Sequence, residues 1–458
     1  MTDSEAALKF IIVGASIAGL ASAIALKHSG HNVVVLERES KLGGTILGQG
    51  GCARVPPNGC KILFDWGLEA QTRANTSIAV GFGVYKHDGG MAPNRDFVGT
   101  SRFNPELMSE ARGDFVQFRY HDLLRILYEE ATKISERVPV SRVTVLFGAD
   151  VANVDSDSCS VTLLSGEIHT GDAIIGADGP SGVVRRTLLQ EEDVNPEICD
   201  VRTGMALCSA VIPKALAIQH PDLASFYEYP ASTVSMGSNS GSITCAVGTE
   251  NDISLWVYTP DSSQDGTWTQ EADKKLPDVL GPCDAKIRKL AALAGSANCV
   301  QSQDHHELES WVSASGKVLV LGEAAHPFPP ASLHAYSVCL EDGAFIGKIF
   351  SYARNPERIP EFFYAFEEHR RSRCSRIREA EKQYIGVITL PDGELQVRRD
   401  VSMRANHAAG RDVMEGEESN LQQMLDDMRM VFAYDPADDA DEWWMSWGRF
   451  RDSANIVS

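Results

Sequence analysis

The stretch from residue 8 to residue 39, LKFIIVGASIAGLASAIALKHSGHNVVVLERE, constrains the fold more than any other part of the chain. Its apolar run at 10–13 predicts a strand that is buried on both faces. The run rich in alanine and leucine that follows predicts a helix, which ends at Gly30. A second apolar run at 33–36 predicts another buried strand. Together these segments predict one βαβ unit of about thirty residues.

The turn after the first strand has the spacing of a turn that binds the pyrophosphate of a dinucleotide. Gly14 permits the sharp turn, Ser16 is small enough for backbone N–H groups to approach a ligand, and Gly19 lets the helix pack closely on the sheet. Ile17 and Ala18 follow at the positive end of the helix, where a phosphate is favoured. This pattern predicts nucleotide binding.

Glu37 supplies the acid that such a site needs. It ends the second strand, where its carboxylate can accept hydrogen bonds from both hydroxyls of a ribose, and Arg38 follows it. Ser16 stands where the usual motif has its second glycine, which weakens the match. The alternative is an ordinary buried βαβ unit with a glycine-rich turn.

The net charge of the chain limits which macromolecules it is expected to bind. The chain has 458 residues, with 42 basic and 63 acidic side chains and a formal net charge of −21. This excess of acid argues against nucleic acid and anionic membranes as partners. The sequence contains no apolar run of about 18–20 residues, so we expect no membrane span.

Cysteine usage and the N-terminus favour a cytoplasmic protein. The ten cysteines are scattered without a CxxC or HExxH pattern, so we expect reduced core thiols, no disulfide framework and no metal site. The first residues, MTDSEAALKF, are too short and too polar for a signal peptide.

Beyond the first unit, the chain alternates between glycine-rich turns and regular segments. A glycine-rich segment that includes Gly50 and Gly51 precedes Arg54, and the segment 76–110 is expected to be irregular. Strand-like runs dominate from about 195 to 300 and predict a mostly antiparallel sheet that is inserted into the nucleotide-binding domain.

Two further glycine-and-acid stretches follow the first one in order. They are Gly176-Ala177-Asp178-Gly179 and Gly322-Glu323, and a strand ending at Arg119 lies between the first two stretches. With these motifs, and with Pro56-Pro57-Asn58 and Tyr434-Asp435-Pro436, the chain resembles the single-component flavin-dependent aromatic monooxygenases. This group includes 4-hydroxybenzoate and salicylate hydroxylases, and the resemblance points to its fungal salicylate-hydroxylase-like branch. It covers nearly the whole chain, to roughly residue 450.

The resemblance implies an α/β fold with three parts. A Rossmann-like FAD-binding domain would comprise residues 1–75, 111–190 and 301–350. An inserted, mostly antiparallel β-sheet substrate domain would comprise 76–110 and 191–300, and a C-terminal helical region would comprise 351–458.

The resemblance also implies which residues contact FAD. They are Gly14, Ser16, Ile17, Ala18, Glu37, Arg38, Gly50, Gly51, Arg54, Arg119, Asp178, Gly322, Glu323, Ala335 and Tyr336.

The resemblance further implies a reaction. FAD stays tightly bound, NADH or NADPH binds transiently to reduce it, and O₂ forms a C4a-hydroperoxide on the reduced flavin. A small aromatic substrate is then hydroxylated, with loss of a carboxylate where the ring carries one. A homodimer stays open as the oligomeric state.

Several residues depart from the family pattern. Glu323 replaces the usual Asp, and His334-Ala335 replace Gln-Gly. His334 is therefore a candidate catalytic acid or base, or a flavin contact; the alternative is a helix N-terminal histidine bonded to backbone. Ser209 replaces a substrate-binding arginine, which leaves Arg54 as a second catalytic candidate or as a loop-stabilising residue. These changes favour a substrate that is larger and less charged than salicylate, such as a prenylated phenol or a fused-ring natural product.

Two other functions remain open at this stage. The same flavin chemistry could give epoxidation of an alkene or indole, or halogenation, although the WxWxIP signature of flavin halogenases is absent. A non-catalytic nucleotide-binding protein on this fold is the third reading.

Overall fold

A parallel sheet carries the N-terminal βαβ unit, as the apolar runs predict. The computed structural model describes residues 7–44, 51–88, 96–134, 141–228, 232–260, 275–295, 297–415 and 418–450. Within these residues the sheet has five strands in the order β18 (Val318–Val320), β12 (Ala173–Gly176), β1 (Lys9–Val13), β2 (Asn32–Glu37) and β8 (Val143–Phe147). All neighbours in it are parallel.

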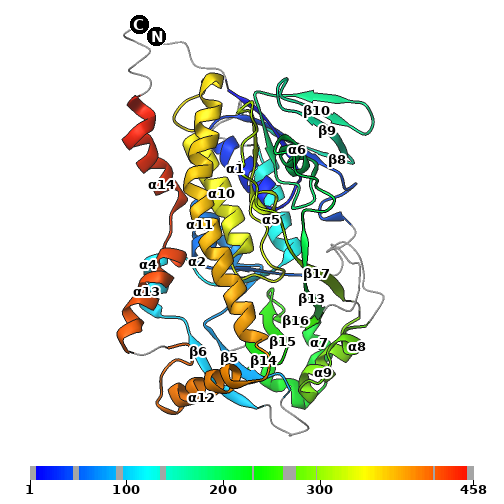
Figure 1. The fold of residues 1–458 in the computed structure, drawn as a ribbon, viewed down its shortest axis with the longest axis vertical. Helices are drawn as coiled ribbons and strands as arrows, with labels where there is room; N and C mark the ends of the chain where they lie inside the picture. The colour runs from blue at the N-terminus through cyan, green and yellow to red at the C-terminus, as the bar shows by residue number, and fades with distance from the viewer. Residues whose placement is uncertain are drawn as a thin grey trace.

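Helices cover this sheet because its strands are apolar on both faces. They are α1 (Ile17–His28), α5 (Tyr120–Thr132), α6 (Val183–Glu191) and α10 (Ala335–Ile349). The largest hydrophobic core lies between these helices and the sheet. A small antiparallel sheet of β11 (Ile168–Thr170), β10 (Ser160–Leu163) and β9 (Val151–Asp155) lies at its edge, in the upper right of Figure 1.

Helices α1 and α10 approach each other closely through small residues. A Cβ atom added to Gly343 would lie 2.6 Å from the Ala21 carbonyl carbon, and one added to Gly347 would lie 2.3 Å from Ala25 Cβ. The Ser29 hydroxyl donates a hydrogen bond of 2.5 Å to the Gly347 carbonyl. Because Ala21 faces Gly343 and Ala25 faces Gly347, the two helices run in the same direction.

A second, larger sheet forms the other half of the molecule. Among the described residues its order is β17 (Asn298–Asp304), β13 (Val201–Ile212), β16 (Asp252–Pro260), β15 (Ser240–Val247), β14 (Thr233–Gly237), β5 (Gly81–Lys86) and β6 (Phe97–Arg102). Only the β14–β5 pair is parallel among the strand pairs described for this sheet. Short helices pack around its β13 side, namely α7 (Lys214–Ala217), α8 (Leu276–Val279), α9 (Ala285–Ala292) and the 3₁₀ segment η2 (Pro221–Phe226).

A small antiparallel sheet joins the two halves. Its order is β3 (Cys52–Val55), β7 (Val116–Arg119) and β4 (Thr76–Ile78), and α2 (Pro57–Asp65), α3 (Glu69–Arg73) and α4 (Pro105–Ala111) lie near it.

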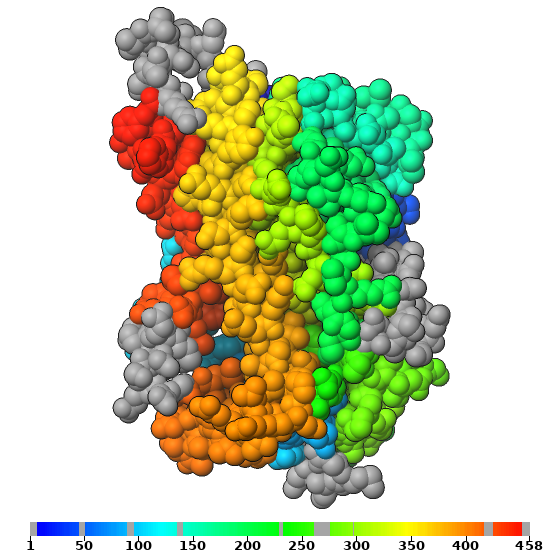
Figure 2. Space-filling view, viewed as in Figure 1, coloured from blue at the N-terminus to red at the C-terminus, as the bar shows by residue number. Residues whose placement is uncertain are grey.

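The C-terminal region is helical, as expected. Its elements are η4 (Pro356–Arg358), α11 (Ile359–Ile388), α12 (Glu394–Ala408), α13 (Glu418–Phe432), α14 (Pro436–Trp443) and the π-helical segment η5 (Trp444–Gly448). Helix α11 runs along the molecule from α10 to β14 and β15, and Figure 2 shows it as a continuous yellow and orange column on this face.

The α/β fold class with a parallel sheet, a mostly antiparallel sheet and C-terminal helices is confirmed. The expectation of an irregular segment at 76–110 is wrong, because it contains β4, β5, β6 and α4. Strand β5 pairs in parallel with β14, which is far away in sequence and leaves no local signal. The boundaries of the three predicted parts stay a prediction, and β17 crosses the one at 300–301.

One cysteine pair departs from the expected reduced state. Cys208 and Cys299 lie opposite each other on β13 and β17, and a disulfide joins them. Their pairing depends on strand register, which the spacing of cysteines in the sequence does not show. No helix among the described residues is long and apolar enough to cross a membrane.

Candidate active site

The turn between β1 and α1 has the shape that a pyrophosphate requires. Gly14 has a φ of +102°, and a Cβ atom added there would lie 2.5 Å from the Ala177 carbonyl oxygen. Ser16 caps α1, because its hydroxyl accepts a hydrogen bond of 3.3 Å from the Gly19 N–H and donates one of 3.0 Å to the Ala177 carbonyl. Ile17 and Ala18 begin the helix, where backbone N–H groups have no partner within the helix.

Glu37 lies at the carboxyl end of β2, beside this turn. Its Oε2 accepts a hydrogen bond of 2.7 Å from the Ala15 N–H, and its Oε1 accepts one of 2.9 Å from the Glu39 N–H. The acid and the turn are therefore brought together as predicted. Arg38 is exposed, with its Nε 3.8 Å from Glu39 Oε1.

Asp178 follows β12 at the same edge of the sheet. Its Oδ2 accepts a hydrogen bond of 3.0 Å from the Val184 N–H at the start of α6, whereas its Oδ1 is buried and has no hydrogen-bond partner among the described residues. Burial raises the pKa of Asp178 to about 6, although the backbone N–H groups at the helix start oppose this shift. An acceptor atom thus remains for a ligand hydroxyl or N–H.

The third predicted motif forms a 3₁₀ turn, η3 (Gly322–Ala324), after β18. The Gly322 N–H donates a hydrogen bond of 2.9 Å to Asp342 Oδ2, and Arg185 Nη1 donates one of 2.7 Å to the Ala324 carbonyl. Glu323 is half-buried, and burial raises its pKa. The turn is therefore held from two sides, by α6 and by α10.

Beneath this turn lies a buried network of charged side chains. Asp342 Oδ2 is 2.6 Å from His326 Nε2, and Asp342 Oδ1 accepts a hydrogen bond of 2.9 Å from Arg370 Nε. Arg370 Nη2 donates one of 2.7 Å to Glu341 Oε2, and Arg373 Nη2 donates one of 2.6 Å to Glu341 Oε1. The chain of alternating charges ties the turn to α10 and α11.

His326, Asp342 and Cys374 also bring potential metal ligands within 4.8 Å of one another. Because Asp342 already accepts hydrogen bonds from Arg370 and from the Gly322 N–H, an ion-pair network explains the group without a cation.

His326 should make the stability of the protein fall as the pH rises. Burial opposes a charge on its imidazole, but the neighbouring Cys374 and Asp342 outweigh burial and raise the pKa of His326 to about 10. The resulting stabilisation is complete below the ordinary pKa of 6.5 and is lost as the pH rises through about 10. Urea unfolding of the wild type should show a fall of up to about 1.4 kcal/mol per pH unit in this window.

The His326→Gln variant is the comparison for this pH dependence. It should be less stable at neutral pH and should lack most of the fall towards alkaline pH, because glutamine does not titrate. Equal slopes in the two proteins would contradict the assignment of this charge to His326.

His334 is the N-terminal cap residue of α10, so Ala335 and Tyr336 begin that helix. The His334 backbone N–H donates a hydrogen bond of 2.8 Å to Glu381 Oε1, and its Nδ1 is buried without a hydrogen-bond partner among the described residues. Burial and the nearby Arg373 lower the pKa of His334 to about 3, so its imidazole is neutral at ordinary pH. A contact between His334 and flavin stays a prediction.

Arg54 and Arg119 both point toward the larger sheet. Arg54 on β3 is 6% exposed, donates a hydrogen bond of 2.6 Å to the Ala331 carbonyl, and lies 4.4 Å from the centre of the Trp256 ring. Arg119 on β7 forms an ion pair with Asp252 on β16. Either role predicted for Arg54 is compatible with this position, and the flavin contact of Arg119 stays a prediction.

Two tyrosines, at the start of α5 and at the start of α10, lie close to each other. The rings of Tyr120 and Tyr336 are 5.8 Å apart, and Glu323 is one of the groups that raise the pKa of both. The Tyr120 N–H donates a hydrogen bond of 2.7 Å to the Gly51 carbonyl. Gly50, also predicted to contact FAD, lies outside the described residues.

A cavity of about 300 Å³ lies between β13, β17 and α11, beside the segment that leads to α10. Its lining includes Met205, Leu207, Tyr258, Pro329, Pro330 and Ile385. We call it the proline-side cavity. Sequence reasoning missed its members, because the alternation in β13 and β16 does not show which face is covered by α11.

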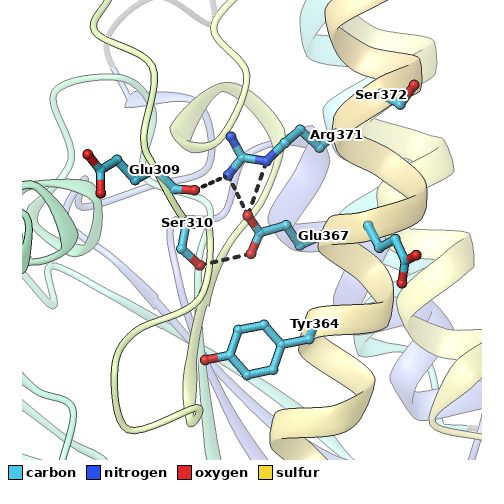
Figure 3. A pocket seen from close by; sticks show the side chains of 7 residues that line it. Glu309, Ser310, Tyr364, Glu367, Arg371 and Ser372 are labelled. Atoms are coloured by element: carbon cyan, nitrogen blue, oxygen red, sulfur yellow. Dashed lines mark hydrogen bonds and ion pairs between the residues drawn. The ribbon is translucent and has the colours of Figure 1, made fainter.

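A second depression lies on the surface of α11 and is shown in Figure 3. There Ser310 Oγ donates a hydrogen bond of 2.9 Å to Glu367 Oε2, and Arg371 Nη1 donates one of 2.8 Å to the Leu308 carbonyl. These polar groups bond to one another, and the depression contains none of the predicted cofactor residues.

The residues present fit FAD. The turn at Gly14 leaves no room for a side chain, as a closely approaching pyrophosphate requires. Glu37 lies at the position of the βαβ unit where an acid binds the ribose. The buried Asp178 Oδ1 has no hydrogen-bond partner among the described residues and can accept a hydrogen bond from a ligand. Assignment of each individual contact stays a prediction.

Comparison with known proteins agrees with this fit. The family model described as FAD binding domain matches residues 7–379. The chain is 25% identical over 402 residues to the FAD-dependent monooxygenase OpS4 of Beauveria bassiana, covering 86% of this chain and 89% of that protein. It is 26% identical over 413 residues to the hispidin-3-hydroxylase of Neonothopanus nambi, covering 84% of this chain and 90% of that protein.

A solved structure shows the same fold. The salicylate hydroxylase substrate complex superposes with a TM-score of 0.71 at 17% identity, covering 96% of this chain and 98% of that one. The chain therefore belongs to the FAD-binding-domain family and is an FAD-dependent monooxygenase of the aromatic-hydroxylase type.

Proposed function

We propose that the protein uses NADH or NADPH and O₂ to hydroxylate a phenolic substrate held in the proline-side cavity. The observation that carries this proposal is the position of the cavity. Pro329 and Pro330 line it, and a short segment leads from them to the N-terminus of α10, where the resemblance predicts the flavin ring. A volume of about 300 Å³ is at the lower end of the range for ligand pockets.

The balance of the reaction is simple. An aromatic C–H, O₂, NAD(P)H and a proton give a C–OH, NAD(P)⁺ and water. FAD held at the Gly14 turn would supply the redox chemistry that links nicotinamide oxidation to the activation of O₂. The route by which it activates oxygen, and the loss of a carboxylate, remain predictions.

The protein's own residues supply position and a dry environment. Met205, Leu207 and Ile385 give the cavity an apolar wall. Water excluded by such a wall cannot compete with substrate for the activated oxygen. The positive end of α10 favours negative charge nearby, which would assist reduction of the cofactor.

A relative supports hydroxylation as the reaction. By its name, the hispidin-3-hydroxylase described above hydroxylates hispidin, and we extend hydroxylation to the present chain, with a phenol as the proposed substrate class. A cytoplasmic location, a homodimer and the exclusion of nucleic acid as a partner remain predictions.

The test is a spectrum followed by a substrate panel. We expect a yellow protein whose NADH or NADPH oxidation rises with one class among phenols, phenolic acids, prenylated phenols and indoles. The product should carry one added oxygen. An epoxide product would favour the alternative reaction, and a protein that cannot be loaded with FAD would refute the proposal.

A further inference from the structure

The charged side chains that line the proline-side cavity already form pairs with acidic or basic neighbours. Lys382 Nζ lies 2.8 Å from Asp304 Oδ1, and Arg378 forms an ion pair with Glu307. His305, which also lines the cavity, has its Nδ1 2.6 Å from Asp200 Oδ2. The positive charges of Lys382 and Arg378 are therefore already compensated, and a substrate carboxylate would add a further negative charge beside Asp304 and Glu307.

Two polar lining groups have a donor atom without a hydrogen-bond partner among the described residues, Arg378 Nε and Tyr258 Oη, and Tyr258 is the uncharged one. This tyrosine on β16 is 4% exposed, and its Oη is buried with no hydrogen-bond partner among the described residues. A buried hydroxyl without a partner is costly, so a ligand atom that accepts its hydrogen bond is favoured. Tyr258 thus brings an uncharged donor without a partner to the lining, beside apolar walls.

The groups around Tyr258 keep its hydroxyl protonated, so that it can donate a hydrogen bond. Burial raises the pKa of the phenol, the nearby Arg54 opposes this shift, and Glu381 and Tyr384 add to it. Arg54 and Glu381 are themselves bonded elsewhere, to the Ala331 carbonyl and to the His334 N–H. Tyr258 therefore keeps its proton at ordinary pH, and neither charged neighbour takes its hydrogen bond.

We propose that Tyr258 orients an uncharged aromatic substrate by donating a hydrogen bond from its Oη to a hydroxyl or carbonyl oxygen of the ring system. The inference rests on the proposed function and sharpens it, because it selects neutral phenols over benzoate-type carboxylates. Tyr258 is a positioning and specificity residue that holds the ring at a fixed angle to the cofactor.

Equilibrium binding to the FAD-loaded protein tests this proposal. The probes are 2-naphthol and its carboxylated counterpart, 3-hydroxy-2-naphthoate, titrated into the wild type by calorimetry. We expect 2-naphthol to bind at least about tenfold more tightly. Preferred binding of the carboxylate would overturn the selection of neutral substrates, and binding of neither probe would overturn the assignment of this cavity.

Two tyrosine variants separate a specific role from a structural one. Tyr258→Phe should bind 2-naphthol about tenfold more weakly and should form less product per NAD(P)H oxidised. Tyr227→Phe is the matched control, because Tyr227 Oη is also buried without a hydrogen-bond partner among the described residues but lies outside the cavity lining. Wild-type affinity and coupling in Tyr258→Phe would overturn the role.

Failure of the hydroxylase proposal can be told apart from failure of the role proposed for Tyr258. A wild type that binds 2-naphthol through Tyr258 but oxygenates no probe would refute the hydroxylase proposal while leaving the binding role intact. If the wild type hydroxylates 2-naphthol and Tyr258→Phe binds and hydroxylates it equally well, the binding role of Tyr258 would be refuted and the hydroxylase proposal would stand.

Discussion

Replacing Arg370 with methionine should lower the free energy of unfolding by about 3–5 kcal/mol. Arg370 is fully buried and bonds to both Glu341 and Asp342, at 2.7 and 2.9 Å. Burial opposes the charge on Glu341, yet Arg373 and Arg370 hold its pKa at about 2, so it stays ionised. Without Arg370, Glu341 keeps Arg373 and Asp342 keeps His326, but each buried carboxylate loses one bonded cation, and urea unfolding should show the loss.

Arg376→Met is the matched control, since Arg376 lies on the exposed side of the same helix. Its unfolding free energy should stay within about 0.5 kcal/mol of the wild type. If Arg370→Met lost less than about 1 kcal/mol, the network would be less important to the fold than its burial implies.

Replacing Gly14 with alanine should weaken FAD binding by about a hundredfold or more, which corresponds to about 3 kcal/mol. The new Cβ would lie 2.5 Å from the Ala177 carbonyl oxygen, so the turn must move away from its present place against β12. The pyrophosphate would then lose its backbone donors. Flavin absorbance of the purified protein, and titration of the apoprotein with FAD, measure this loss.

Gly166→Ala controls for backbone strain alone. Gly166 also has a positive φ, of +86°, but an added Cβ would meet no atom within 4 Å. It should cost about 1–2 kcal/mol of stability and leave FAD affinity unchanged. Equal FAD affinity in Gly14→Ala and Gly166→Ala would show that the clash at Ala177 does not matter.

Local patterns in the sequence were enough to predict the nucleotide half. The strand, turn and helix around Gly14 lie within one continuous stretch, and Glu37 ends the next strand as its position predicts. Because the strand, the turn and the helix of such a unit follow one another directly in the sequence, their hydrophobic pattern can be recognised in the residues alone.

The substrate half could not be predicted in the same way. Arg54, Tyr258 and Glu381 come from β3, β16 and α11, which are separated by more than a hundred residues in the chain. No local pattern in the sequence shows which face of β16 is covered by α11. The pairing of Cys208 with Cys299 likewise depends on the register of β13 against β17. Long-range register and the packing of helices on sheets decide these contacts.

The parallel arrangement of α1 and α10 has an electrostatic consequence. With Gly343 opposite Ala21, α10 begins about one turn, or roughly 6 Å, ahead of α1, so the positive poles of both helices lie at one edge of the sheet. Like poles side by side repel each other, and the repulsion falls when an anion or dissolved salt screens them. A dinucleotide whose phosphates bind at this edge would therefore act as a counterion as well as a redox group, because its phosphates would relieve a repulsion that the fold creates.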